Sequence, residues 1–403
     1  MIDAVPNTPQ KHARAGDALE VARVFLRLGL TSFGGPIAHL GYFRREFVER
    51  RHWVDERHFG QLLALCQFLP GPASSQLGFS IGLLRAGWAG ALAAFIAFTL
   101  PSALLMFAFA EVSDRFAGAS GQAAIHGLKL VAVAVVAQGV LGMSRTLCPD
   151  RPRALMAVAA LGLIELGSSS PWTPLLVVIG GAALGPWACR QVEVRQGETF
   201  SLHYGPRTGT CLLVAYAALL AVALIVAPLL PPLAQIAAAF YRTGALVFGG
   251  GHVVLPLLKQ AVVDPGWITP DRFLTGYGAA QAVPGPMFTL SAYLGKELHG
   301  SAGGALGATV SLLAIFLPGL LMVSGALPFW RAWAARTQAV RMLAGVNAVV
   351  VGLLAAALYD PVWVGAVHEG KDVGIAAVAF VGLTAGRWPP LIAVAWCVVV
   401  SVL

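Results

Sequence analysis

Residues 25–35 read FLRLGLTSFGG, and residues 240–250 read FYRTGALVFGG. The two stretches agree at six of eleven positions, with an offset of 240 − 25 = 215. A second pair follows in the same order, QFLPGP at 67–72 and QAVPGP at 281–286, with an offset of 281 − 67 = 214. Several matches in order at a nearly constant offset indicate a tandem duplication, since composition alone would produce only isolated coincidences.

The composition predicts which solvent surrounds the two halves. Hydrophobic residues occupy 57% of the 403 positions and charged residues only 11%, with a mean hydropathy of +0.75. A soluble domain carries about 25% charged residues. The stretches 89–110, 209–230 and 302–327 each contain no charged side chain, and about 20 apolar residues are enough to cross a bilayer as a helix. Long unbroken apolar runs favour helices over a β-barrel, so we predict an all-α polytopic membrane protein.

The remaining composition excludes several classes of site. The net charge of +8 fits basic cytoplasmic loops better than nucleic-acid binding. The five cysteines have no CxxC or metal-ligand spacing, so we interpret them as small core residues and expect neither a metal nor a cofactor. Residues 1–20 lack an apolar core of the signal-peptide type and are interpreted as a cytoplasmic tail.

The repeat and the loop charges predict a layout in five parts. They are the tail at 1–20, an N-terminal transporter repeat at 21–189, a polar linker at 190–208, an unpaired central span at 209–231 and a C-terminal transporter repeat at 232–403. An odd central span turns the second half over, so the two homologous halves are expected to form an inverted repeat with the basic loops inside.

The number of full crossings depends on how the Gly- and Pro-broken segments run. If the segments near 24–42 and 61–84 are re-entrant, the basic loops of the first half all lie on one side and about nine spans result. The first half then crosses at about 88–113, 122–145, 152–166 and 172–189. If every apolar segment crosses completely, about thirteen spans result. We favour broken or re-entrant helices.

The repeated blocks contain the residues least compatible with a continuous helix. Gly costs about 1 kcal/mol and Pro about 3 kcal/mol relative to Ala in a helix interior. Broken backbone at membrane depth is tolerated only where protein or a water-filled cavity surrounds it. Each break also leaves free N–H groups at the start of the next half-helix, which is a ready anion site. Close helix packing is the alternative explanation for single glycines, but a matched set of breaks favours a substrate site.

Candidate substrate-binding residues follow from these blocks. They combine backbone donors at the breaks with hydroxyl and amide side chains beside them: Gly34, Gly35, Gln67, Gly71, Ser74, Ser75, Gly249, Gly250, Gln281, Gly285 and Thr289. No catalytic residue is expected.

Four charged or titratable residues near the breaks extend the prediction. Arg27 and Arg242 are repeat-equivalent, and a guanidinium fork suits two oxygens of a tetrahedral oxyanion. Arg27 can alternatively reach the cytoplasmic interface, whereas Arg242 follows a longer apolar run. His39 and His252 flank the breaks without being repeat-equivalent, and either proton coupling or a structural hydrogen bond would explain them.

At these residues the sequence resembles the chromate ion transporter family, of the long, two-domain type. The resemblance rests on Phe33-Gly-Gly-Pro36, the charged loop with Trp53, Pro70-Gly-Pro72, and their second copies, and it spans roughly residues 20–403. One departure is that Gly251 replaces the equivalent of Pro36. The resemblance implies export of chromate from the bacterial cytoplasm across the inner membrane, which confers chromate resistance. The residues alone indicate only an oxyanion carrier.

Three other classes of function make different demands on the sequence. An uptake carrier for sulfate or another oxyanion shares every feature above, and sulfate is expected to compete with chromate because charge and shape are alike. A membrane-embedded enzyme would need paired carboxylates, a metal cluster or a nucleotide loop, which the chain lacks. A channel would need a charged ring or carbonyl filter. Membrane lipid is the expected surrounding, and the sequence leaves homodimer formation open.

Overall fold

The computed structural model describes residues 15–113, 118–166, 173–191, 200, 202–248, 254–298 and 303–403. These residues fold almost entirely into helices, and no strand occurs among them. The predicted all-α class is confirmed. The candidates Gly249, Gly250 and His252 lie outside the described residues.

The first half contains two short broken segments followed by long helices. Its elements are α1 (Ala15–Thr31), α2 (Gly35–Phe43), the π-helical turn η1 (Arg44–Arg50), α3 (Glu56–Phe68), α4 (Ala73–Ser113), α5 (Ala119–Leu147), α6 (Arg151–Leu166) and α7 (Thr173–Ala188). Residues 88–113 of α4 and the helices α5, α6 and α7 match the four segments predicted as crossings to within a few residues. That they cross the membrane stays a prediction.

A central helix and the second half follow the linker. The central segment is α8 (Pro206–Ala221) with η2 (Val222–Val226) and η3 (Ala227–Leu229). The second half contains α9 (Pro232–Leu246), α10 (Val254–Leu258), η5 (Lys259–Val263), α11 (Pro270–Ala282), η6 (Met287–Thr289), α12 (Leu290–Glu297), α13 (Gly304–Ala326), η8 (Leu327–Phe329), α14 (Trp330–Ala334), α15 (Thr337–Ala357), η9 (Leu358–Trp363), α16 (Val364–Ala366), α17 (Gly370–Thr384) and α18 (Pro390–Val402).

Local structure corresponds between the halves wherever the repeat is described. The bounds of α3, Glu56–Phe68, and of α11, Pro270–Ala282, differ by 270 − 56 = 214 and 282 − 68 = 214. Both helices carry a side-chain N-cap at the same repeat position, Asp55 and Thr269, each accepting from the backbone N–H three residues on. The inverted orientation of the second half stays a prediction.

The helix α4 is a tight hairpin rather than one continuous rod. Gly87 has φ +61° at the turn, so residues 73–85 and 88–113 form two arms. A Cβ on Gly90 would lie 2.3 Å from the Gly82 carbonyl oxygen, so the arms touch backbone to backbone. In the second half α12 and α13 are divided at the same repeat position.

The first broken segment folds back on itself. Ring centroids of Phe25 in α1 and Phe43 at the end of α2 are 5.7 Å apart, and Phe25 stacks on Phe47 at 5.0 Å. The segment therefore returns along α1 after the break near Gly34, which is the geometry expected of a re-entrant segment. The number of full crossings stays a prediction.

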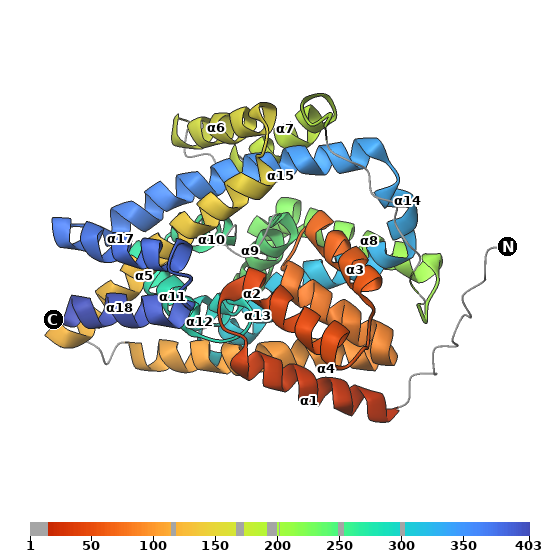
Figure 1. Ribbon diagram of the computed structural model, residues 1–403, viewed down its shortest axis with the longest axis horizontal. Helices are drawn as coiled ribbons and strands as arrows, with labels where there is room; N and C mark the ends of the chain where they lie inside the picture. The colour runs from red at the N-terminus through yellow and green to blue at the C-terminus, as the bar shows by residue number, and fades with distance from the viewer. Residues whose placement is uncertain are drawn as a thin grey trace.

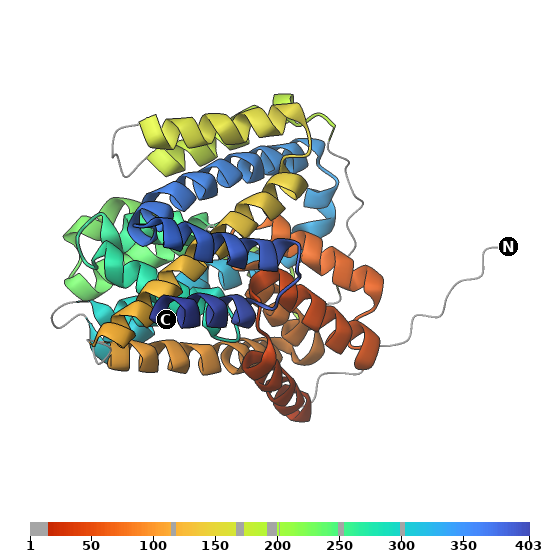
Figure 2. The same ribbon diagram turned by 60° about the vertical axis from the view of Figure 1, so that its left-hand side comes forward.

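The outer helices of each half pack against helices of the other half. In Figure 1 the long helix α15 of the second half runs beneath α6 and α7 of the first, and it packs against both. Reciprocally, α5 packs against α17 and α18, which lie across it in Figure 2. The glycines Gly127 and Gly345 permit these approaches, since a Cβ on either would lie under 3 Å from backbone of the opposite half.

Five of the described helices are long and apolar enough to cross a membrane: Ala73–Ser113, Ala119–Leu147, Pro206–Leu229, Gly304–Trp333 and Thr337–Ala366. Their outward faces are apolar as well, with Ile225 75% and Leu229 85% exposed on the central segment. Such a surface fits a lipid surrounding. The central segment begins at Pro206, slightly before the predicted 209.

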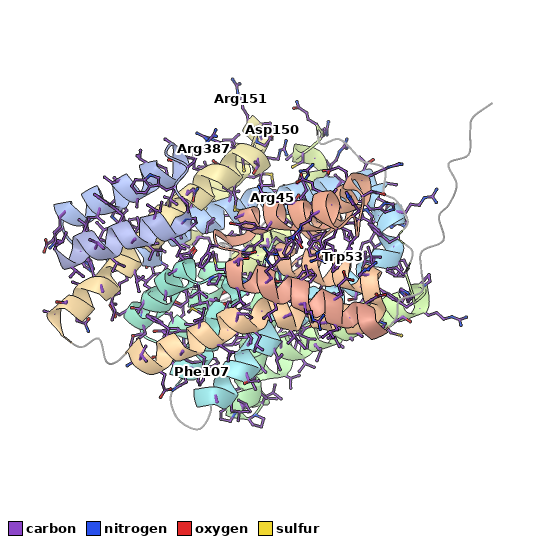
Figure 3. All side chains as sticks on the ribbon, turned by 60° about the horizontal axis from the view of Figure 1, so that its bottom comes forward. Arg45, Trp53, Phe107, Asp150, Arg151 and Arg387 are labelled. Atoms are coloured by element: carbon purple, nitrogen blue, oxygen red, sulfur yellow. The ribbon has the colours of Figure 1, made fainter. Side chains whose placement is uncertain are left out.

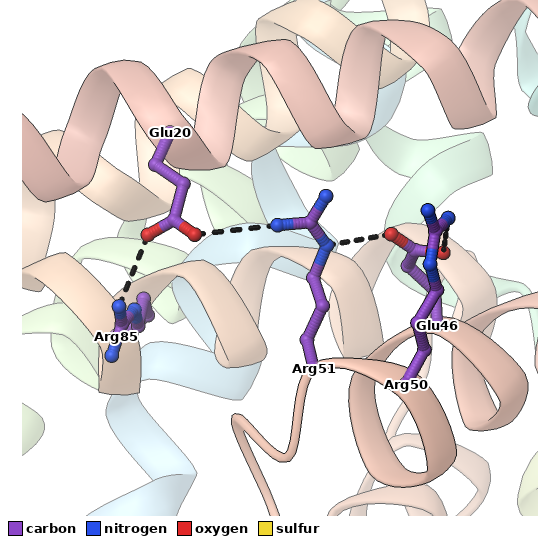
Figure 4. A network of polar contacts seen from close by, with 5 residues as sticks. All are labelled: Glu20, Glu46, Arg50, Arg51 and Arg85. Atoms are coloured by element: carbon purple, nitrogen blue, oxygen red, sulfur yellow. Dashed lines mark hydrogen bonds and ion pairs between the residues drawn. The ribbon is translucent and has the colours of Figure 1, made fainter.

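An ion-pair network joins the charged loop to α1 and to the α4 hairpin (Figure 4). Arg51 contacts Glu46 at 2.6 Å and Glu20 at 3.3 Å, and Arg85 contacts Glu20 at 3.0 Å. The guanidinium carbons of Arg51 and Arg85 lie 5.5 and 5.3 Å from the Trp53 ring centroid. The network holds the loop between α2 and α3 against the end of the first α4 arm.

Candidate functional site

The breaks of the two halves meet as reciprocal pairs. The Gly285 amide donates to the Ser32 carbonyl over 2.9 Å, and the Gly71 amide donates to the Val247 carbonyl over 2.7 Å. Ser32 and Val247 are repeat-equivalent, 247 − 32 = 215, and so are Gly71 and Gly285, 285 − 71 = 214. Each Pro-Gly-Pro block therefore donates to a carbonyl two residues before the first glycine of the other half's glycine block, so both halves contribute to the contact.

Glycine is required at both Pro-Gly-Pro turns. Gly71 has φ +122° and Gly285 has φ +99°, a region that side-chain-bearing residues rarely occupy. A Cβ on Gly71 would lie 2.9 Å from the Gly319 Cα, and one on Gly285 would lie 3.0 Å from the Ser102 Cβ. Long helices of the opposite half therefore pack directly onto the turns.

One cavity lies where the first glycine block meets the second Pro-Gly-Pro block. Four predicted residues line it, Gly34, Gly35, Gln281 and Gly285, together with Gln138 from α5. The cavity has a volume of about 40 Å³, which exceeds the space one water needs. Gln281 is only 8% exposed, and its Nε2 donates to the Tyr277 carbonyl at 3.5 Å.

The start of α2 opens on this cavity. Gly34 is its N-cap with φ +102°, and no side chain caps the helix. Apart from Pro36, which has no N–H, the first residues of such a helix present N–H groups without an intrahelical acceptor, and the positive end of the helix dipole lies there. An anion in the cavity is an effective partner for such a terminus. The Gln138 Nε2 donates to the Leu383 carbonyl at 3.3 Å, so this amide is held in place.

His39 is buried behind the break and does not line the cavity. Its Nε2–H donates to the Ser32 carbonyl at 3.1 Å, because a carbonyl only accepts, and its Nδ1 lies 3.4 Å from the Ser74 hydroxyl. The Ser32 carbonyl thus receives both His39 and Gly285. This places His39 and Ser74 as supports of the break beside the cavity.

The remaining hydroxyl candidates are buried near the turns. Thr289 Oγ1 donates to the Pro286 carbonyl at 2.7 Å and accepts from Ser102 at 2.6 Å. Ser75 Oγ is buried and has no hydrogen-bond partner among the residues that the structure describes. Gln76, on the next position, donates to the Pro70 and Gly319 carbonyls at 2.8 and 3.0 Å.

The two arginines occupy different environments. Arg27 lies on the exposed face of α1, away from the cavity. Arg242 is half-buried on α9 and lines a separate cavity of about 60 Å³ with Thr243 and Gln260. Within the described part of the chain Arg242 has no hydrogen-bond or ion-pair partner.

The structure therefore unites only part of the predicted set. Gly34, Gly35, Gln281 and Gly285 share one cavity, whereas Gln67, the equivalent of Gln281, is exposed on α3. The repeat equivalents of Gly34 and Gly35, which are Gly249 and Gly250, lie outside the described residues. Gln138 and Ser102 were not predicted from the sequence. An amide inside the apolar run of α5 was the available signal for Gln138.

Comparisons with known proteins agree with this architecture. The chromate transporter family model matches residues 19–186 and 234–402, one match in each half. The chain is 29% identical over 354 residues to a chromate transport protein of Pseudomonas aeruginosa, covering 83% of this chain and 79% of that protein.

Two further relatives match most of both chains. A chromate transport protein of Cupriavidus metallidurans is 28% identical over 84% of this chain and 81% of its own length. An uncharacterized transporter of Methanocaldococcus jannaschii is 25% identical over 84% of this chain and 83% of its own length. No solved structure matches the chain. The family model covers most of both halves, and the chain belongs to the chromate transporter family.

Proposed function

We propose that the chain exports chromate from the bacterial cytoplasm across the inner membrane, and that the cavity between the two halves binds the anion. The observation that carries this proposal is the N-terminus of α2, which has no side-chain cap and opens on a cavity lined by Gln138 and Gln281. Family membership supports chromate as the substrate.

The donors around the cavity suit a tetrahedral dianion. Backbone N–H groups at a helix start and side-chain amides bind oxyanions without a full opposing charge. Because chromate and sulfate share charge and shape, such donors discriminate poorly between them. Sulfate therefore competes with chromate in this proposal.

Arg242 supplies the positive charge in a second cavity, which we place on the path of the transported anion. A guanidinium within an apolar helix is costly unless it meets an anion or water, and the described residues offer Arg242 no carboxylate. Its forked donors match two oxygens of an oxyanion. We assign it a transient contact with chromate, distinct from the site at the break.

The membrane potential is sufficient to drive export. Moving one charge through 100 mV is worth about 2.3 kcal/mol. A dianion that leaves a negative-inside cell therefore gains about 4.6 kcal/mol per 100 mV. Proton coupling is not required, and transport that stops when only the pH gradient is collapsed would contradict this.

The test measures chromate accumulation in a sensitive bacterium that expresses the chain, followed by uptake into everted membrane vesicles. Wild type is expected to lower cellular chromate and to load everted vesicles, with sulfate as an inhibitor. Gln281→Glu, which places a carboxylate in the cavity, should lose this activity at equal membrane abundance, while Gln281→Asn retains part of it. Raised cellular chromate with wild type would overturn export and favour oxyanion uptake.

A further inference from the structure

A groove between α5, α6 and α15 lies apart from both cavities described above. Its volume is about 440 Å³. Its walls are mainly apolar, with Ala157 and Leu161 from α6 and Val351 from α15, while Arg145 and Cys148 lie at the end of α5. The neighbouring outward face of α6 is apolar as well, with Leu155 69% exposed. The groove therefore opens on an apolar outer surface of the molecule.

Small residues keep the groove open. A Cβ on Gly352 would lie 2.1 Å from the Ala157 carbonyl oxygen, so α6 and α15 touch backbone to backbone at its floor. Ala154, Ala157 and Leu161 lie about one turn apart on α6, which makes the groove roughly 10 Å long along the helix at 1.5 Å per residue. That shape accommodates part of an acyl chain.

One end of the groove carries an uncompensated positive charge. Arg145 lies in the last turn of α5, is exposed, and forms no ion pair within the described part of the chain. The only acid of the adjoining loop is Asp150, and Arg153 engages it at 2.6 and 2.8 Å. Three arginines and one aspartate give the loop 145–153 a net charge of 3 − 1 = +2.

We propose that this groove binds an anionic phospholipid, with the phosphate on the Arg145 guanidinium and an acyl chain along Ala154, Ala157 and Leu161. Apolar walls below a basic mouth match the two parts of such a lipid, because a guanidinium pairs with phosphate oxygens while an acyl chain packs on apolar side chains. The site is independent of the transported anion and lies where α5 and α6 of one half meet α15 of the other.

Cys148 provides a native reporter, because it lines the groove and is half-buried. Three of the other cysteines, Cys66, Cys189 and Cys397, are buried, and only Cys211 is exposed. The variant Cys211→Ser therefore leaves Cys148 as the accessible thiol. The full chain is placed in nanodiscs of phosphatidylcholine, with or without phosphatidylglycerol, and its labelling by a small maleimide is timed.

Phosphatidylglycerol should slow labelling about fivefold, the effect expected of one basic contact with an anionic lipid. Arg145→Gln should remove most of this protection in the same anionic membrane, which also controls for surface pH. Arg151→Gln should keep it, because the Arg151 side chain points away from the molecule (Figure 3). Ala154→Phe, which fills the groove, should slow labelling in both lipids.

Two outcomes would overturn the proposal. Equal labelling rates in the two membranes would mean that the groove does not prefer an anionic lipid. Full protection by phosphatidylglycerol in Arg145→Gln would mean that bilayer charge, rather than this arginine, slows the reaction. Chromate transport by Arg145→Gln reports separately on the proposed function.

Discussion

The Gly285 amide and the Ser32 carbonyl, 253 positions apart in the chain, form a hydrogen bond of 2.9 Å across the two halves. Gly71 and Val247 form the equivalent bond of 2.7 Å. Because each bond satisfies a backbone group at a break, the two breaks stabilise one another. Any change in the relative position of the halves would alter these bonds, and the candidate anion site lies at the same contact.

Gly285→Ala tests whether the geometry of this turn is needed for transport. An L-residue at φ +99° costs about 1–2 kcal/mol, and the added methyl meets Ser102. We expect chromate transport to fall about tenfold or more, since a loss of 1.4 kcal/mol corresponds to a factor of ten. Gly266→Ala is the matched control, because Gly266 also has a positive φ, +77°, but has open space around it. Equal transport by both variants would contradict a role for the turn.

Arg242→Gln and Arg27→Gln separate two residues that the repeat makes equivalent. Arg242 lines a cavity and has no partner within the described part of the chain, whereas Arg27 lies on the exposed face of α1. We expect Arg242→Gln to lose most chromate efflux, Arg242→Lys to keep part of it, and Arg27→Gln to remain close to wild type. Efflux is measured at equal membrane abundance. Comparable losses of efflux in both glutamine variants would mean that Arg27 also contributes to chromate transport.

The helices and the positions of the breaks could be predicted from the sequence, but the contacts between the breaks could not. Gly34, Gly35 and Gln281 were identified because Gly and Pro interrupt apolar runs and polar side chains lie beside them. The crossing of each glycine block with the opposite Pro-Gly-Pro block could not be predicted, because Ser32 and Gly285 have no local signal of their contact.

The exposed position of Arg27 had a signal in the sequence. Glu20, Arg23 and Arg27 recur at three- and four-residue spacing along α1, on a face that the buried Val21, Phe25 and Leu28 do not share. The pairing of Arg27 with Arg242 in the repeat drew attention away from this period, although Leu26 and Leu30, 44% and 53% exposed, also lie on the outer side of the helix.

His39 offers a test between proton coupling and structural support. His39 is buried and donates to the Ser32 carbonyl, which also accepts from Gly285. We expect His39→Gln, which retains a donor, to keep transport and its pH profile, and His39→Leu to lose transport because a buried carbonyl loses a partner. Rates are compared in vesicles between pH 5.5 and pH 8, which spans the ordinary titration range of histidine. A flattened pH profile with His39→Gln would instead support proton coupling.

Gly244→Ala tests how strongly the packing of α9 on α13 contributes to stability. A Cβ at Gly244 would lie 2.0 Å from the Ile315 carbonyl oxygen, and its repeat equivalent, Gly29, meets the Phe98 carbonyl at 2.8 Å. Overpacking of this kind costs about 1–3 kcal/mol, and backbone on both sides leaves little room for relief. We expect the melting temperature in detergent to fall by several degrees.

Gly41→Ala is the control for that experiment. Gly41 lies within α2 with nothing within 4 Å of an added Cβ, and Ala is favoured over Gly in a helix by about 1 kcal/mol. Its melting temperature should equal or exceed that of wild type. If Gly244→Ala melts at the wild-type temperature while Gly41→Ala behaves as expected, then α9 can shift away from α13 without loss of stability. The contact would then be a sliding surface between the broken segment and the long helix, rather than a fixed one.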